Sequence, residues 1–140
     1  MNPYHHALSS AEKYGGEPED YQQLHDGFDE SKAFFPDIRH RALRHHAEGI
    51  FLAERIFGPT ITNCQGRVIP TRFLGEQHVK EDLGWIPTVQ VWLKCLMLQP
   101  WMLKSGTTPT ITTSQEVPSP VQMSAAVALP ANPQTGKETM

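Results

Sequence analysis

Cysteine is scarce in this sequence, since only Cys64 and Cys95 occur in 140 residues. One potential pair makes no disulfide framework for a chain of this length, and two isolated thiols do not form a zinc signature. Long apolar runs are also missing, and no segment reaches the roughly 18 residues of a membrane-spanning helix. The N-terminus has no apolar core behind a basic start, which argues against a secretory signal peptide. These absences predict a protein of the reducing cytoplasm with no membrane segment.

Positive charge is not in excess either. The formal net charge is −3 and the pI is near 6.1, so no global basic field attracts nucleic acid or an anionic membrane. Nucleic acid is therefore not an expected partner, although local basic clusters could still hold a phosphate. No internal repeat is present, and 140 residues suit one ordinary domain.

The C-terminal quarter has few residues that could build a core. Residues 105–140 contain five of the twelve prolines, no aromatic residue and three charged groups. Such a segment cannot bury enough apolar surface to offset the entropy of ordering it. The sequence therefore predicts a single helical domain over residues 1–104 and a disordered tail, rich in Thr, Ser, Pro and Ala, over residues 105–140.

Within residues 1–104, apolar residues recur mainly at helical spacing, and proline and glycine mark the helix boundaries. The predicted helices cover residues 2–15, a segment that begins at Pro18, and residues 36–57, 75–83 and 86–98. A small hairpin over residues 60–62 and 67–69 precedes the fourth helix. The fold class is mainly α, a compact bundle of about four to five helices with a small β-hairpin. Its core is expected to include Trp85, Trp92 and Trp101.

Ionisable residues share the apolar faces of these predicted helices. In the second helix, His25, Asp29 and Lys32 lie on the inner face, which is costly unless they pair or bind a ligand. Whether this segment is one bent helix or two stays open. In the first helix, His5 and His6 fall beside or opposite the apolar stripe and are expected to be half-exposed. The alternative is that His5 reaches into a site.

The third helix carries a cluster of basic residues. A helical wheel places His45 and His46 toward the interior and His40 on the outer side. Arg41 and Arg44 flank the inner arc and are expected on a solvated face, balanced by nearby acids.

The inward-facing imidazoles and carboxylates form a candidate metal site drawn from three helices. This combination of ligands suits a divalent transition metal such as zinc, manganese or iron. The spacing of four residues in His25/Asp29 and in His78/Asp82 puts each pair on one helix face. The predicted metal ligands are His25, Asp29, His45, His46, His78 and Asp82, with Asp26 and His5 in reserve.

A metal at this site could lower the pKa of a bound water and supply hydroxide at neutral pH. Lys32 would then be the catalytic residue that steadies a phosphate oxygen, and Arg41 or Arg44 could add a second contact. Such a set of residues is typical of a metal-dependent hydrolase acting on a phosphorylated small molecule or nucleotide.

Several long strings in residues 1–102 resemble a family of short uncharacterised bacterial and phage proteins. The strings are NPYHHALSSA, DESKAFF, RHRALRHH and GEQHVKEDLG, followed by IPTV. A more distant likeness is to HD-domain-like helical proteins, in which a His-Asp pair precedes a serine or glycine and a lysine. The motif can be placed in two ways. His25-Asp26 is a literal His-Asp pair, but the lysine follows it at a greater distance than in the motif. Asp29-x-Ser31-Lys32 has the spacing of the motif from aspartate to lysine, but Phe28 stands where the motif has histidine.

Three functions are consistent with these residues. The first is an HD-like metal-dependent phosphohydrolase. The second is a non-catalytic accessory protein of phage or mobile-element origin that binds a ligand or another protein. The third is a buried polar network that only holds the helices together.

Overall fold

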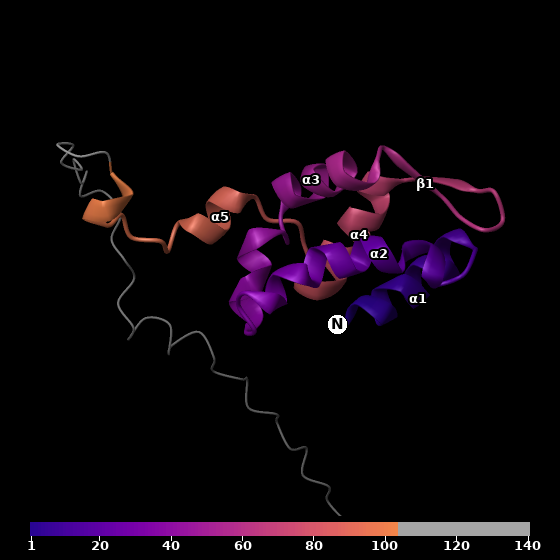
Figure 1. The fold of residues 1–140 in the computed structure, drawn as a ribbon, viewed down its shortest axis with the longest axis horizontal. Coiled ribbons are helices and arrows are strands. Elements are labelled where there is room, and N and C mark those ends of the chain that lie inside the picture. Colours follow the sequence, from indigo (N-terminus) through magenta and orange to yellow (C-terminus); the bar gives the residue numbers. More distant parts are fainter. Residues whose placement is uncertain (104–140) are drawn as a thin grey trace, which may run out of the picture. The chain divides into compact units, whose positions relative to one another are not determined.

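The computed structural model describes residues 1–103. Residues Met1–Met97 form one compact unit, and a second unit begins at Leu98. The elements of the first unit are α1 (Pro3–Tyr14), α2 (Glu19–Asp29), η1 (Glu30–Ala33), η2 (Ile38–Leu43), α3 (Ala47–Phe57), β1 (Thr60–Thr62), β2 (Val68–Pro70), α4 (Thr71–Leu83) and α5 (Val89–Leu93), where η marks a 3-10 helix (Figure 1). The second unit contributes η3 (Pro100–Met102).

The prediction of a mainly helical fold with a small hairpin is confirmed. The predicted disordered tail over residues 105–140 lies outside the described residues, and the domain boundary at residue 104 stays a prediction. Within residues 1–103, no helix combines the length and the apolar character needed to cross a bilayer.

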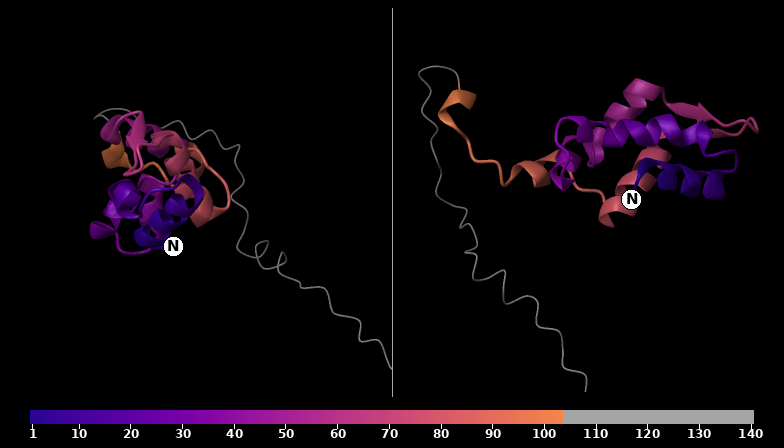
Figure 2. Two further views of the ribbon diagram at one scale, coloured as in Figure 1. Left: turned by 90° about the vertical axis from the view of Figure 1, so that its right-hand side faces the viewer. Right: turned by 60° about the horizontal axis from the view of Figure 1, so that its bottom comes forward.

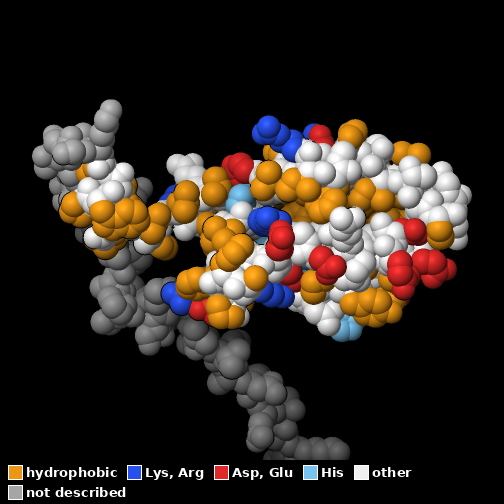
Figure 3. Space-filling model, in the orientation of Figure 1, with side chains coloured by type: hydrophobic (Ala, Val, Ile, Leu, Met, Phe, Trp, Pro, Cys, Tyr) orange, Lys and Arg blue, Asp and Glu red, His pale blue; other side chains and the backbone are white. Residues whose placement is uncertain are grey.

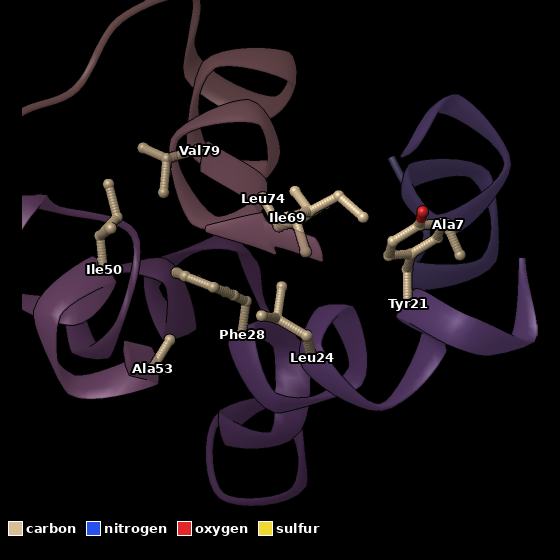
Figure 4. Packing of buried hydrophobic residues seen from close by; sticks show 9 residues of the cluster. All are labelled: Ala7, Tyr21, Leu24, Phe28, Ile50, Ala53, Ile69, Leu74 and Val79. Carbon is tan, nitrogen blue, oxygen red and sulfur yellow. The ribbon is translucent and has the colours of Figure 1, made fainter. Parts of the chain in front are cut away.

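Helices α1 and α2 lie side by side, α3 packs against α2, and α4 contacts all three of these helices (Figures 1 and 2). The core between them consists of nine buried side chains: Ala7, Tyr21, Leu24, Phe28, Ile50, Ala53, Ile69, Leu74 and Val79. Figure 4 shows Leu24 and Phe28 of α2 directed toward the residues of α3 and α4. This core places the last turn of α2 next to the last turns of α4.

Local sequence explains most of the element boundaries. The side chain of Asn2 accepts a hydrogen bond from the His5 amide at 3.0 Å and caps α1, as a short polar residue at this position is expected to do. Gly15 ends the helix with a φ of 82°, a conformation that favours glycine. The hairpin pairs Thr60 with Pro70 in antiparallel register.

The predicted helix over residues 36–57 is wrong. The chain forms η2, then turns, and α3 starts only at Ala47. The His46 side chain caps α3 by accepting from the Gly49 amide at 2.9 Å. A Cβ on Gly49 would collide with the Arg44 carbonyl oxygen, so the turn closes tightly there. Because this break changes the helical phase, His40 faces inward with 2 % exposure, opposite to the prediction.

The predicted last helix is also wrong, since only α5 forms within residues 86–98 and it has no buried residue. Trp85 and Trp101 are 55 % and 80 % exposed and do not pack in the core. Trp92 is half-buried, and its Nε1 donates to the His45 carbonyl oxygen at 3.0 Å. Figure 3 shows apolar side chains gathered on the surface around η2 and α5.

Two smaller corrections concern α1 and α4. His5 is exposed, whereas His6 is fully buried, so neither imidazole is half-exposed and His5 does not reach inward. Helix α4 begins at Thr71, four residues before the predicted start, because the second strand runs directly into it.

Candidate metal centre

Four side chains from three parts of the chain meet beside the core. They are Asp29 at the end of α2, His45 in the turn before α3, and His78 and Asp82 on successive turns of α4. We call them the tetrad. One ligand atom from each lies within 4.8 Å of the other three. Within residues 1–103, no other group of three or more such side chains converges in this way.

The tetrad's donor atoms face one another at short range. His45 Nε2 lies 3.0 Å from an oxygen of Asp82, 3.2 Å from His78 Nε2 and 3.5 Å from Asp29 Oδ1. His78 Nε2 lies 3.7 Å from Asp82 Oδ2 and 3.9 Å from Asp29 Oδ1. These separations are close to those between ligand atoms bound to one metal at about 2.0–2.2 Å.

Each tetrad carboxylate directs one oxygen inward and the other toward a cation. The outer oxygen of Asp29 accepts a hydrogen bond from Lys32 Nζ at 2.9 Å. The outer oxygen of Asp82 lies 3.3 Å from Arg41 Nη2 and 2.7 Å from the Met1 amino group. His6 Nε2 approaches the same Asp82 oxygen at 3.4 Å. The cations therefore contact only one oxygen of each carboxylate, and the other oxygen faces the tetrad imidazoles.

The inner oxygen of Asp29 has no hydrogen-bond partner, although it is buried. A buried carboxylate oxygen that lacks a partner costs free energy comparable to a lost charged hydrogen bond. The groups around it are imidazole nitrogens, with His40 Nε2 also at 3.9 Å. A cation bound among these nitrogens would satisfy the oxygen.

The protonation states of His78 and Asp82 suit metal binding. Burial lowers the pKa of His78 far below its ordinary value, so this imidazole is neutral at pH 7. Burial works to raise the pKa of Asp82, but hydrogen bonds with His45 and His6 outweigh it and hold that pKa well below its usual range. Neutral imidazoles and ionised carboxylates are the forms that bind metals.

The structure brings four of the six predicted ligands together, namely Asp29, His45, His78 and Asp82. His25 lies behind His78, with the two Nδ1 atoms 3.0 Å apart. His46 caps α3 and is not in the tetrad. The reserve residue Asp26 is exposed and accepts from Gln22. Lys32 contacts Asp29, and its side chain is 45 % exposed.

Sequence reasoning missed three neighbours of the tetrad: His6, His40 and Glu81. His6 Nδ1 lies 2.5 Å from a Glu81 oxygen, and its ring centroid is 3.9 Å from that of His78. His6 is four residues before Ser10, and both are buried. That spacing marks a second inward stripe on α1 and is the signal that could have found His6. Arg41 is expected in solvent from the sequence, but it pairs with Asp82.

Comparison with protein families gives one match. The family described as "Domain of unknown function (DUF6915)" matches residues 1–102. The chain belongs to this family. The DUF6915 match includes all four tetrad residues, and it confirms the predicted relationship to uncharacterised proteins over this range. No curated protein and no solved structure matches the chain.

Proposed function

We propose that this DUF6915 protein binds one divalent transition metal in the tetrad and hydrolyses a phosphate ester of a small molecule. The partnerless inner oxygen of Asp29 carries the proposal, because it is a buried anion surrounded by imidazole nitrogens. Two imidazoles and two carboxylates suit zinc, manganese or iron. When bound, such a metal supplies a hydroxide nucleophile at neutral pH.

The coordination number separates a catalytic from a structural metal. Zinc held by four protein ligands in a tetrahedral site is closed. Manganese or iron prefers more ligands than the tetrad offers, which leaves positions for water and substrate. The proposed hydrolysis therefore favours manganese or iron, whereas zinc would favour a structural centre.

Lys32 and Arg41 support a phosphorylated substrate. Both cations touch the outer carboxylate oxygens of the tetrad, and their side chains are 45 % and 16 % exposed. They can therefore contact a phosphate at the surface while it approaches the centre. In hydrolysis, water oxygen would bond to phosphorus, the ester P–O bond would break, and the released alcohol oxygen would take a proton.

The geometry also bears on the likeness to HD-domain proteins. Asp29 is in the tetrad and Asp26 is at the surface, which supports the placement on Asp29-x-Ser31-Lys32. A reducing cytoplasm is our proposed location, because Cys64 and Cys95 are both free and exposed.

A non-catalytic accessory protein, of phage or mobile-element origin, is the second candidate. The observation that favours it is the apolar surface around η2 and α5. Monomeric proteins rarely expose large contiguous patches of apolar side chains, so such a patch is typical of a binding surface. Ile38, Leu43, Trp85, Leu93 and Leu96 are each 49–67 % exposed. A protein partner covering this surface would fit that candidate.

Elemental analysis and a hydrolysis assay test the first candidate. The purified full chain should contain about one transition metal per molecule and should hydrolyse p-nitrophenyl phosphate or nucleotides when loaded with Mn²⁺ or Fe²⁺. Lys32→Met should raise KM for the phosphate ester at least several-fold. Lys13→Met removes an exposed lysine from α1, away from the tetrad, and should leave KM unchanged. Metal content without hydrolysis of any phosphate ester would reject the enzyme and keep the metal centre.

A further inference from the structure

Behind His78, on the side away from the tetrad, four polar side chains form a continuous hydrogen-bonded chain through the interior. We call Glu81, Gln77, Ser10 and His25 the relay. Gln77 Nε2 lies 2.9 Å from a Glu81 oxygen, and Ser10 Oγ lies 3.1 Å from Gln77 Oε1. Ser10 Oγ is 2.9 Å from His25 Nε2, and His25 Nδ1 is 3.0 Å from His78 Nδ1.

The Glu81 end of the relay fixes the direction of every hydrogen bond. A carboxylate only accepts hydrogen bonds, so the Gln77 amide must turn its NH₂ group toward Glu81. The Gln77 oxygen then faces Ser10, and the Ser10 hydroxyl donates to it. Having used its one hydrogen, the Ser10 oxygen can only accept from His25. His25 therefore carries its proton on Nε2.

The same constraint passes from His25 to His78. His25 is fully buried, and its two ring nitrogens contact Ser10 and His78 rather than a carboxylate. Because a buried charge without an opposite charge beside it is costly, His25 is a neutral ring with one N–H. With that hydrogen on Nε2, His25 Nδ1 is a bare acceptor and His78 Nδ1 must donate to it. A neutral His78 then has a bare Nε2, the atom that faces the tetrad carboxylates and His45.

We propose that the relay is a positioning device that selects the His78 tautomer whose Nε2 lone pair points to the metal position. Without it, the opposite tautomer would be favoured, because His78 Nε2–H could donate to the nearby carboxylates. That hydrogen would occupy the direction needed by a metal. Groups that orient a metal-bound histidine typically change metal affinity about 10- to 100-fold. This role rests on the proposed metal centre, but the tautomer itself does not.

The first test reads the tautomers in the unmodified, metal-free full chain. Long-range ¹H–¹⁵N NMR correlations of the imidazole rings distinguish a protonated from a bare nitrogen. The expected result is a proton on Nε2 of His25 and on Nδ1 of His78. A proton on Nε2 of His78 would overturn the inference, whether or not the protein binds a metal.

The second test compares two neighbouring serines on α1. Ser10→Ala removes the acceptor of His25, and Ser9→Ala removes a hydroxyl that donates to Glu81 without touching His25. Ser10→Ala should shift His78 toward the Nε2–H form and weaken Mn²⁺ or Zn²⁺ binding about 10- to 100-fold. Ser9→Ala should do neither. Equal metal affinity in the two variants would overturn the inference.

A third variant covers the case in which Ser10→Ala does not fold. Gln77→Met keeps the side-chain length and removes the oxygen that orients Ser10, so it should produce the same change in the His78 tautomer. If neither the unmodified protein nor any variant binds metal, the metal centre is rejected. The NMR result still shows whether the relay sets the His78 tautomer.

Discussion

Replacing Asp29 by asparagine should separate metal binding from stability, because the two are expected to change in opposite directions. The inner oxygens of Asp29 and Asp82 lie within 4.8 Å of each other. Two unit charges at that distance repel by about 3.5 kcal/mol at an effective dielectric constant of about 20. The substitution Asp29→Asn removes this repulsion, and the NH₂ group of the new amide can donate to a bare imidazole nitrogen.

Two losses offset that gain. The Lys32–Asp29 ion pair disappears, but Lys32 is 45 % exposed and a pair of this kind contributes about 0.2–1 kcal/mol. The Arg41 charge beside Asp82 already reduces part of the repulsion. We therefore expect the free energy of unfolding of metal-free Asp29→Asn to equal that of the unmodified protein or to exceed it by about 1–2 kcal/mol. Each kcal/mol of this gain should raise Tm by about 4–8 °C.

Adding metal should make the unmodified protein more stable than Asp29→Asn, which reverses the order of their free energies of unfolding. At a free metal concentration about 100 times Kd, the unmodified protein gains about 2.7 kcal/mol. Asp29→Asn should gain almost nothing, since it has lost the oxygen that lacked a partner. Urea unfolding with a chelator and then with Mn²⁺ or Zn²⁺ measures both quantities. Asp26→Asn, at an exposed position on the same helix, should match the unmodified protein in both.

The reasoning would be refuted by an Asp29→Asn variant that is clearly destabilised without metal, combined with an unmodified protein that no metal stabilises. The four tetrad residues would then form a polar network in which the carboxylate is structurally required.

Three further outcomes follow from single residues. His46→Ala should cost about 1 kcal/mol of stability through loss of the α3 cap and should leave metal affinity unchanged in a titration. Gly49→Ala should destabilise the fold by about 3 kcal/mol or prevent folding, because the added Cβ would meet the Arg44 carbonyl; a normal melting curve would contradict this. Burial lowers the pKa of His25 from 6.5 to about 3, so the unfolded chain binds the extra proton. His25 alone should therefore lower the free energy of unfolding of the metal-free protein by up to about 1.4 kcal/mol per pH unit below a pH of about 6.5, until pH approaches about 3. The buried His78, whose pKa is also lowered, adds to this loss in the same direction. Equal stability at about pH 7 and about pH 5 would contradict the buried neutral state.

The sequence was sufficient to predict the helices whose caps are local. Asn2 and Gly15 bound α1 as expected, and the spacing of His78 and Asp82 placed both on the inner face of α4. The face of α2 that carries Tyr21, Leu24 and Phe28 was correct for the same reason, since a regular helix keeps its period. These patterns placed Asp29, His78 and Asp82 on the helix faces that meet in the tetrad.

The main failures occurred where the chain interrupts a predicted helix. The histidine pair at residues 45 and 46 looked like the middle of a long helix, but the His46 ring caps a new one. That break turns His40 inward and separates His46 from the tetrad. The relay was also beyond prediction, because it joins Ser10 to Gln77 across 67 residues of chain.

X-ray diffraction at the absorption edge of a bound metal tests the central claim most directly. Crystals of the full chain grown with Mn²⁺ or Zn²⁺ should show one anomalous peak about 2.0–2.2 Å from His45 Nε2, His78 Nε2 and the inner oxygens of Asp29 and Asp82. The absence of an anomalous peak between these four side chains would contradict the account, whether the metal binds elsewhere in the protein or does not bind at all.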